Sequence, residues 1–227
     1  MFFFYWPIDI LIFAAFGLAM WAQFRVQSTF QRWAKEPVLS GLTGYEAARR
    51  MLDANGLHDV PVEPVQGTLT DHYDPIHRVV RLSEPVYSGQ SISAISVACH
   101  EVGHAIQHKV KYPMLVARHR IFPITRLASS IAPLLLIAGF IFQETNLIGL
   151  AIIFFSFAVL FQVITLPVEF NASSRARELM ISYGFITNNE ERGAAKVLNA
   201  AALTYVAAAA IAVLELFKFI MIFRDQN

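Results

Sequence analysis

The chain of 227 residues is 56% hydrophobic and only 15% charged, with 19 Phe, and its mean hydropathy is +0.48. This composition excludes an ordinary water-soluble domain and predicts a mainly α-helical membrane protein, with about four spans and a modest domain outside the lipid bilayer. The net charge of +1 gives no reason to expect a nucleic-acid partner. Cys99 is the single cysteine, which excludes a disulfide within the chain, and we expect it to be a buried packing residue.

Residues 1–24 are almost continuously apolar and predict the first transmembrane helix, which we place from Trp6 to Phe24. The segment has neither a basic start nor a clear small-residue cleavage site, so we interpret it as an uncleaved span and not as a secretory signal. The segment 27–39 is polar and amphipathic, and we expect it to lie along the membrane surface.

Residues 25–126 predict a small α+β domain that ends with a metal-binding helix. Thr43 and Glu46 match an N-cap and its capping-box partner, and Asn55-Gly56 stops the helix that they begin. The elements that follow are a strand at 60–65, a loop at 67–74 and a second strand at 78–83. We expect the strand at 78–83 to offer an edge on which an extended peptide could pair.

The segment 93–109 is predicted to be helical and contains the sequence H-E-V-G-H. Side chains four residues apart lie on one face of a helix, so His100 and His104 can bind the same metal ion. Glu101 lies about 100° around the helix, where it can reach a water on the metal without binding the metal itself. This is the H-E-x-x-H arrangement of zinc peptidases. Gly103 weakens the helix by about 1 kcal/mol relative to Ala, which suggests that another segment packs closely against it.

The second half of the chain is predicted to return to the membrane. The expected parts are a transmembrane hairpin at 127–167, a segment at 168–198 and a C-terminal transmembrane helix at 199–227. The helix of the segment 168–198 is expected to start at Pro167, with Glu169 in its first turn. The loops 25–126 and 168–198 hold 16 of the 18 Lys and Arg residues. The positive-inside rule therefore predicts that both loops face the cytoplasm.

A catalytic zinc ion normally has three protein ligands and one open position, so two histidines are not enough. Two spans separate His104 from Glu169, and the chain therefore returns to the side that it left, which makes Glu169 the leading candidate for the third ligand. His72 and His77 are alternatives in the loop before the second strand. His108 continues the i+4 series, but it lies about 12 Å along the helix axis from His100, too far to share a metal.

The sequence resembles a family in several places at once. The matching runs are T-D-H-Y-D-P at 70–75, V-R-L-S at 80–83, A-C-H-E-V-G-H-A-I-Q at 98–107 and L-P-V-E-F-N-A-S at 166–173. Together they resemble the bacterial membrane-bound neutral zinc metallopeptidases of the YugP-like group, over nearly the whole chain. They are more distantly similar to the HtpX-like and prenyl-protein endopeptidases, whose third ligand begins an E-x-x-A-D motif.

The resemblance implies Zn²⁺ held by His100, His104 and Glu169, a zincin-like domain at the membrane surface, and location in the inner membrane of a bacterium. Ser173 stands where the distant relatives have aspartate. In place of that aspartate, the resemblance implies that Ser173 or Asn171 hydrogen-bonds to a metal-binding residue without binding the metal itself.

These features predict a gluzincin-type endopeptidase with Glu101 as general base, acting on a protein or peptide that can itself be membrane-associated. Tyr73, His72 and Arg175 are candidates for stabilising the oxyanion. A zinc-binding membrane scaffold or sensor without catalysis is the alternative. A transporter is disfavoured because ionisable residues are few in the spans and lie close to their ends.

Overall fold

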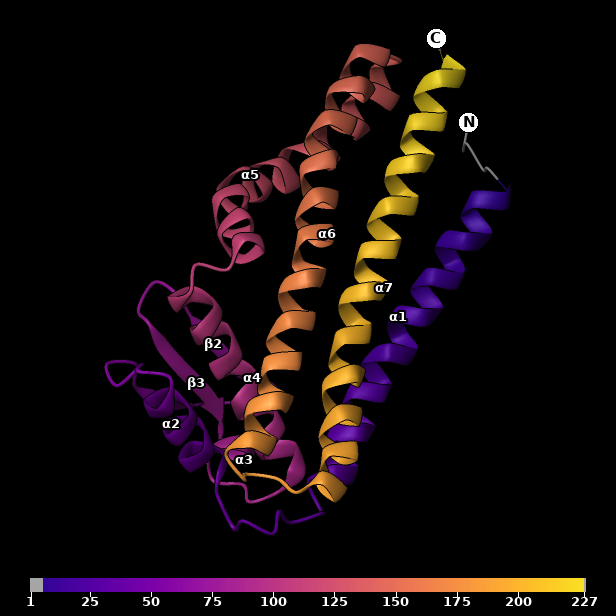
Figure 1. Ribbon diagram of the computed structural model, residues 1–227. Helices are drawn as coiled ribbons and strands as arrows, with labels where there is room; N and C mark the ends of the chain where they lie inside the picture. The colour runs from indigo at the N-terminus through magenta and orange to yellow at the C-terminus, as the bar shows by residue number, and fades with distance from the viewer. Residues whose placement is uncertain (1–5, 227) are drawn as a thin grey trace. The chain divides into compact units, whose positions relative to one another are not determined.

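The computed structural model describes residues 6–226, and within them the chain is mainly helical with one small sheet, as its sequence predicts. The helices are α1 (Trp6–Trp33), α2 (Gly44–Ala54), α3 (Glu84–Tyr87), α4 (Ile92–Lys109), α5 (Pro113–Phe142), α6 (Thr145–Ser182) and α7 (Asn188–Gln226), and the strands are β1 (Val62–Val65), β2 (His72–Asp74) and β3 (Val79–Ser83). Figure 1 labels each of these elements except β1.

The chain divides into two compact units. The first, called here the apolar unit, comprises Met1–Ala22, Pro113–Pro167 and Thr204–Asn227. The second, called here the mixed unit, comprises Gln23–Tyr112 and Val168–Leu203. The segment 113–126, which the sequence analysis grouped with the metal-binding domain, belongs to the apolar unit as the first part of α5.

Among the described residues, four helices are long and apolar enough to cross a membrane. These candidate spans are Pro7–Trp33, Pro113–Phe142, Thr145–Ser182 and Asn188–Asp225. Each of the four predicted spans overlaps one of them. Residues 1–5 of the predicted first segment and residue 227 of the predicted last one lie outside the described part of the chain.

α1 does not end at Phe24 but continues as a single helix to Trp33. Residues 27–33 of the segment expected along the membrane surface are therefore part of the same helix as the first span. Between Arg25 and Trp33 the sequence has neither glycine nor proline, so nothing interrupts helix propagation there. The first helix breaker is Pro37, and α1 ends shortly before it.

Pro167 lies inside α6 and does not begin a new helix, contrary to the sequence-based expectation. A proline in a helix interior removes one backbone hydrogen bond and costs about 3 kcal/mol. The helix continues because an apolar environment strongly favours internal backbone bonding on both sides of that one lost bond. Glu169 is consequently held on a continuous helix instead of in a first turn.

α2 begins and ends where its sequence signals place it. The Thr43 hydroxyl accepts the Glu46 N–H at 3.1 Å, and the Glu46 carboxylate accepts the Thr43 N–H at 2.8 Å, which completes the predicted capping box. At the other end, Gly56 adopts a positive φ of 65° that few other residues tolerate. The Lys109 ammonium group donates to the carbonyl groups of Asn55 and Gly56, so α4 holds this end of α2.

The sheet has the order β1-β3-β2. β3 pairs in parallel with β1, with Val62 opposite Val80, and antiparallel with β2, with Tyr73 opposite Val80. β3 is therefore the central strand, and the expectation that residues 78–83 offer a free edge is wrong. β2 lies within the predicted loop 67–74. Its three residues are too few to show the alternation that predicts a strand.

The helix that contains the H-E-x-x-H sequence packs in the core of the mixed unit. Ser91 caps α4, since its hydroxyl accepts the Ala94 N–H at 3.2 Å. The core around α4 consists of fully buried side chains from several elements, including two from α4 itself: Met51, Leu52, Val80, Leu82, Val86, Ile95, Val102 and Met180. Each large buried side chain contributes about 1.5–3 kcal/mol. Cys99 is fully buried among them, and burial raises the pKa of its thiol, as expected of a packing residue.

Candidate metal centre

His100 and His104 lie on the same face of α4, one helical turn apart, as their spacing predicts. Their ring centroids are 4.8 Å apart and the ring planes are nearly perpendicular. Both side chains are largely buried, with 13% and 12% of their surfaces exposed. Two neutral imidazoles in this arrangement offer two nitrogen ligands to one ion.

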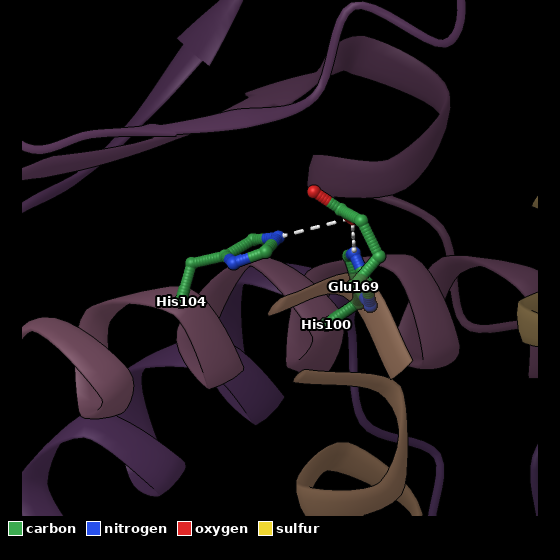
Figure 2. Close-up of side chains that lie close together, drawn as sticks. All are labelled: His100, His104 and Glu169. Carbon is green, nitrogen blue, oxygen red and sulfur yellow. Dashed lines mark ion pairs between the residues drawn. The ribbon is translucent and has the colours of Figure 1, made fainter. Parts of the chain in front are cut away.

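α6 supplies a carboxylate to the same point. Figure 2 shows Glu169 beside the two imidazoles. Its Oε2 atom lies 3.4 Å from Nε2 of His100 and 3.5 Å from Nε2 of His104. Tetrahedral coordination with ligand bonds near 2.0–2.1 Å separates neighbouring ligand atoms by about 3.3–3.4 Å. The two distances from the carboxylate oxygen to the imidazole nitrogens therefore match those expected around a tetrahedral ion of the size of zinc.

The three ligand atoms all lie within 4.8 Å of one another, and they form the one group of this kind found among residues 6–226. The Glu169 side chain is 4% exposed, so its negative charge is withdrawn from water. Burial alone would lower the pKa of His104, but the hydrogen bond and charge of Glu169 raise it above its usual value. The group thus favours a positive charge between its members, which a bound Zn²⁺ would supply.

Glu101 follows His100 on α4 and is largely buried, with 8% of its surface exposed. Its Oε2 atom accepts the backbone N–H of Tyr73 on β2 at 3.0 Å. β2 therefore fixes the orientation of the carboxylate beside the histidine pair. No sequence signal indicated this contact, because β2 itself was not recognised as a strand.

Ser173 and Asn171 both lie on α6 close to the histidine helix. The Ser173 hydroxyl is 3.2 Å from Nδ1 of His100. The Asn171 side-chain oxygen accepts hydrogen bonds from Gln107 at 3.0 Å and from Arg175 at 2.8 Å. Of the two residues, Ser173 is the one that contacts a histidine directly.

The three candidates for oxyanion stabilisation differ in their surroundings. The Tyr73 hydroxyl lies 2.8 Å from Nδ1 of His108, and burial raises its pKa, so it stays protonated. His72 is exposed and its Nδ1 lies 2.8 Å from the Thr70 carbonyl oxygen. Arg175 uses its Nε to bond Asn171. None of the three belongs to the group of candidate metal ligands, His100, His104 and Glu169.

The remaining histidine alternatives lie outside the cluster as well. His77, considered as a third ligand, has its Nδ1 2.6 Å from Oδ2 of Asp74 and remains exposed. His108 contacts Tyr73, in agreement with the expectation that it cannot share a metal with His100.

Gln107 is a site residue that the sequence analysis missed. It is fully buried, and its Oε1 lies 3.0 Å from Nδ1 of His104. The sequence signal for Gln107 is weak, because it consists only of an amide three residues after a histidine, which places both side chains on one face of the helix.

The fold and the metal centre agree with what comparison of the sequence with known proteins shows. Residues 8–224 match the family model described as "Putative neutral zinc metallopeptidase", and the chain belongs to this family. The family implies Zn²⁺ as the cofactor, which the donor set of two imidazoles and one carboxylate suits.

One curated relative covers nearly the whole chain. The chain is 64% identical over 220 aligned residues to the protein named "Putative membrane protease YugP" of Bacillus subtilis (strain 168). The aligned region covers 96% of this chain and 98% of the relative. No solved structure matches the chain. Together with the four apolar helices, the relative identifies this chain as an integral membrane protein.

Proposed function

We propose that this chain is a membrane-embedded zinc endopeptidase whose mixed unit is a zincin-like catalytic domain of the gluzincin type. The observation that carries the proposal is the convergence of His100, His104 and Glu169 from two helices, with Glu101 buried next to them. Zinc binding alone requires only the first three residues. The orientation of Glu101 by the Tyr73 N–H, which a purely structural zinc site does not need, favours catalysis.

In the proposed mechanism, Glu101 is the general base. Bound zinc would lower the pKa of a coordinated water to about 7 and polarise the carbonyl group of the peptide. Glu101 accepts a proton from the attacking water and passes it to the leaving amine. The bond from Tyr73 holds one oxygen of the Glu101 carboxylate, so little reorganisation is needed when the proton moves.

We place the candidate site on the cytoplasmic side of the inner membrane, because the segments 25–126 and 168–198 carry most of the Lys and Arg residues. A site on a chain with four spans favours protein or peptide substrates that are themselves membrane-associated. β2 is the sheet edge that contacts α4, so an extended substrate would pair with β2 and not with the central strand β3.

Cysteine labelling tests the orientation. Cys99 is buried and contributes little background reactivity. In intact cells, a membrane-impermeant thiol reagent should label Glu144→Cys in the short turn after α5 but leave Glu36→Cys unlabelled until the membrane is opened. The reverse pattern would place the mixed unit outside the cytoplasm.

Zinc content and cleavage of casein, measured on detergent-solubilised protein, test the activity. The wild type should bind zinc and cleave, Glu101→Gln should keep zinc and lose cleavage, and Glu169→Ala should lose zinc. Equal zinc content in all three proteins would exclude Glu169 as a ligand. Zinc binding by a wild type that cleaves neither casein nor membrane-protein substrates would favour the scaffold or sensor function.

A further inference from the structure

Gln107 joins the two halves of the candidate metal centre. It lies on α4 and is fully buried. Its Oε1 is 3.0 Å from Nδ1 of His104, and its Nε2 donates to the Val168 carbonyl oxygen at 2.8 Å and to Oδ1 of Asn171 at 3.0 Å. Both N–H groups and the oxygen of the amide are therefore engaged, as burial of an amide requires.

These contacts determine which way the amide points. A backbone carbonyl oxygen only accepts hydrogen bonds, so the NH₂ group of Gln107 must face Val168. Its oxygen then faces His104 and can only accept. Nδ1 of His104 must consequently carry a proton, which leaves Nε2, the nitrogen that faces Glu169, as the one that can bind a metal.

The same amide also reaches the backbone that carries the third ligand. Val168 directly precedes Glu169 on α6, and Val168 is fully buried. The oxygen of the Gln107 amide thus contacts His104, a proposed ligand on α4, and its nitrogen contacts the turn of α6 that holds Glu169. A change in the amide would alter both the orientation of one ligand and its distance from another.

We propose that Gln107 is a positioning residue for zinc, which fixes the His104 tautomer and ties α4 to α6 at Glu169. The inference rests on the proposed zinc site but makes a separate claim about it. Hydrogen bonds from outside the ligand set typically change metal affinity by about 10–100-fold when removed. The expected magnitude for Gln107 lies in this range, since both of its contacts act on ligands.

Zinc affinity, measured by competition with a chelator, tests the proposal without any assay of activity. Gln107→Met keeps the volume of the side chain and removes all of its hydrogen bonds, so it should bind zinc about 10–100-fold more weakly than the wild type. Ser93→Ala is the matched control. It removes one buried hydrogen bond from the same helix, to the Phe30 carbonyl oxygen at 2.8 Å, and should leave zinc affinity unchanged.

The possible outcomes separate the two claims. Wild-type affinity in a folded Gln107→Met protein would overturn the role of Gln107 while leaving the zinc site intact. Absence of zinc binding by the wild type would instead overturn the proposed function. If Gln107→Met does not fold, the tautomer can be read in the metal-free wild type from the ¹⁵N shifts of labelled histidine, with His104→Gln for assignment. A proton on Nδ1 of His104 supports the proposal, and a neutral ring with its proton on Nε2 overturns it.

Discussion

Gly103 of α4 and Ala172 of α6 are in direct backbone contact beside the metal centre. A Cβ atom placed on Gly103 would lie 2.8 Å from the carbonyl oxygen of Ala172 and 3.2 Å from its Cα. Since these are backbone atoms, they cannot move aside by changing a rotamer. The absence of a side chain at Gly103 therefore sets how closely the histidine helix approaches the helix of Glu169.

The first prediction concerns this contact. Gly103→Ala gains about 1 kcal/mol of helix propensity, but the clash should cost about 1–3 kcal/mol and push α4 and α6 apart. We expect zinc affinity to fall by more than the loss of folding stability alone would cause, because the displacement moves the proposed ligands on α4 and α6 apart. Gly17→Ala in α1, where a Cβ would meet no atom within 4 Å, is the control. Wild-type zinc affinity in Gly103→Ala would contradict the prediction.

The second prediction concerns Ser173. Its hydroxyl oxygen is 3.2 Å from Nδ1 of His100. It can accept a hydrogen bond from the N–H that this nitrogen carries when Nε2 binds a metal. Ser173→Ala should weaken zinc binding up to about 10-fold, and less than Gln107→Met does, because a single hydroxyl contact is lost. Ser174→Ala, an exposed neighbour on the same helix, should have no effect. The measurement is zinc affinity by chelator competition, and equal effects of the two substitutions would contradict the assignment.

The third prediction concerns removal of the metal. A ligand present at 100 times its dissociation constant stabilises the folded state by about 2.7 kcal/mol, so a strong chelator should lower the melting temperature of the protein in detergent. Glu101→Gln should retain this response, since Glu101 is not a ligand in the proposed site. Glu169→Ala should lose it at the same zinc concentration. A response that survives in Glu169→Ala would indicate a different third ligand.

The fourth prediction concerns the apolar unit. Asp9 of α1 is 4% exposed and forms an ion pair with Lys218 of α7. Removing one partner of a buried pair leaves an uncompensated charge and typically costs about 3–5 kcal/mol. Asp9→Ala should therefore lower the melting temperature markedly, and the exchange Asp9→Lys with Lys218→Asp should restore part of the loss. No recovery in the exchanged protein would show that the charges themselves do not hold the two helices together.

The fifth prediction concerns pH. The side-chain hydrogen bond with His77 is the main influence that holds the pKa of Asp74 well below its usual value, and the Arg81 guanidinium at 2.9 Å lowers it further. A depressed carboxyl pKa stabilises the fold fully above the unfolded value of about 3.9, and this stabilisation is lost as the pH falls below it. Asp74→Asn should thus lower the melting temperature at pH 7, and the difference from wild type should narrow below about pH 3.9. A difference that widens toward low pH would contradict the assignment.

Local sequence signals were sufficient where the structure depends on neighbouring residues. The capping box at Thr43, the helix end at Asn55-Gly56 and the apolar length of the spans all act over a few residues or along one helix, and each reappears in the structure. The pairing of His100 with His104 was predictable for the same reason, because helical geometry alone places residues at i and i+4 together.

Other features required partners that are distant along the chain. β2 is a strand only because β3 pairs with it, and β3 is central only because β1 and β2 take its two sides. Pro167 looked like a helix start, yet α6 continues through it, since one lost hydrogen bond is outweighed by those around it.

The metal centre combines both kinds of information. Residue type and helical period are enough to identify His100, His104 and Glu101 as candidate site residues and to predict the membrane character of the chain. The distances of 3.4 and 3.5 Å from Glu169 to the two imidazoles, and the contacts by which Gln107 joins His104 to the backbone of α6, depend instead on the tertiary structure. The contacts between α4 and α6 join residues more than 60 positions apart, and packing of the two helices at Gly103 brings these residues together.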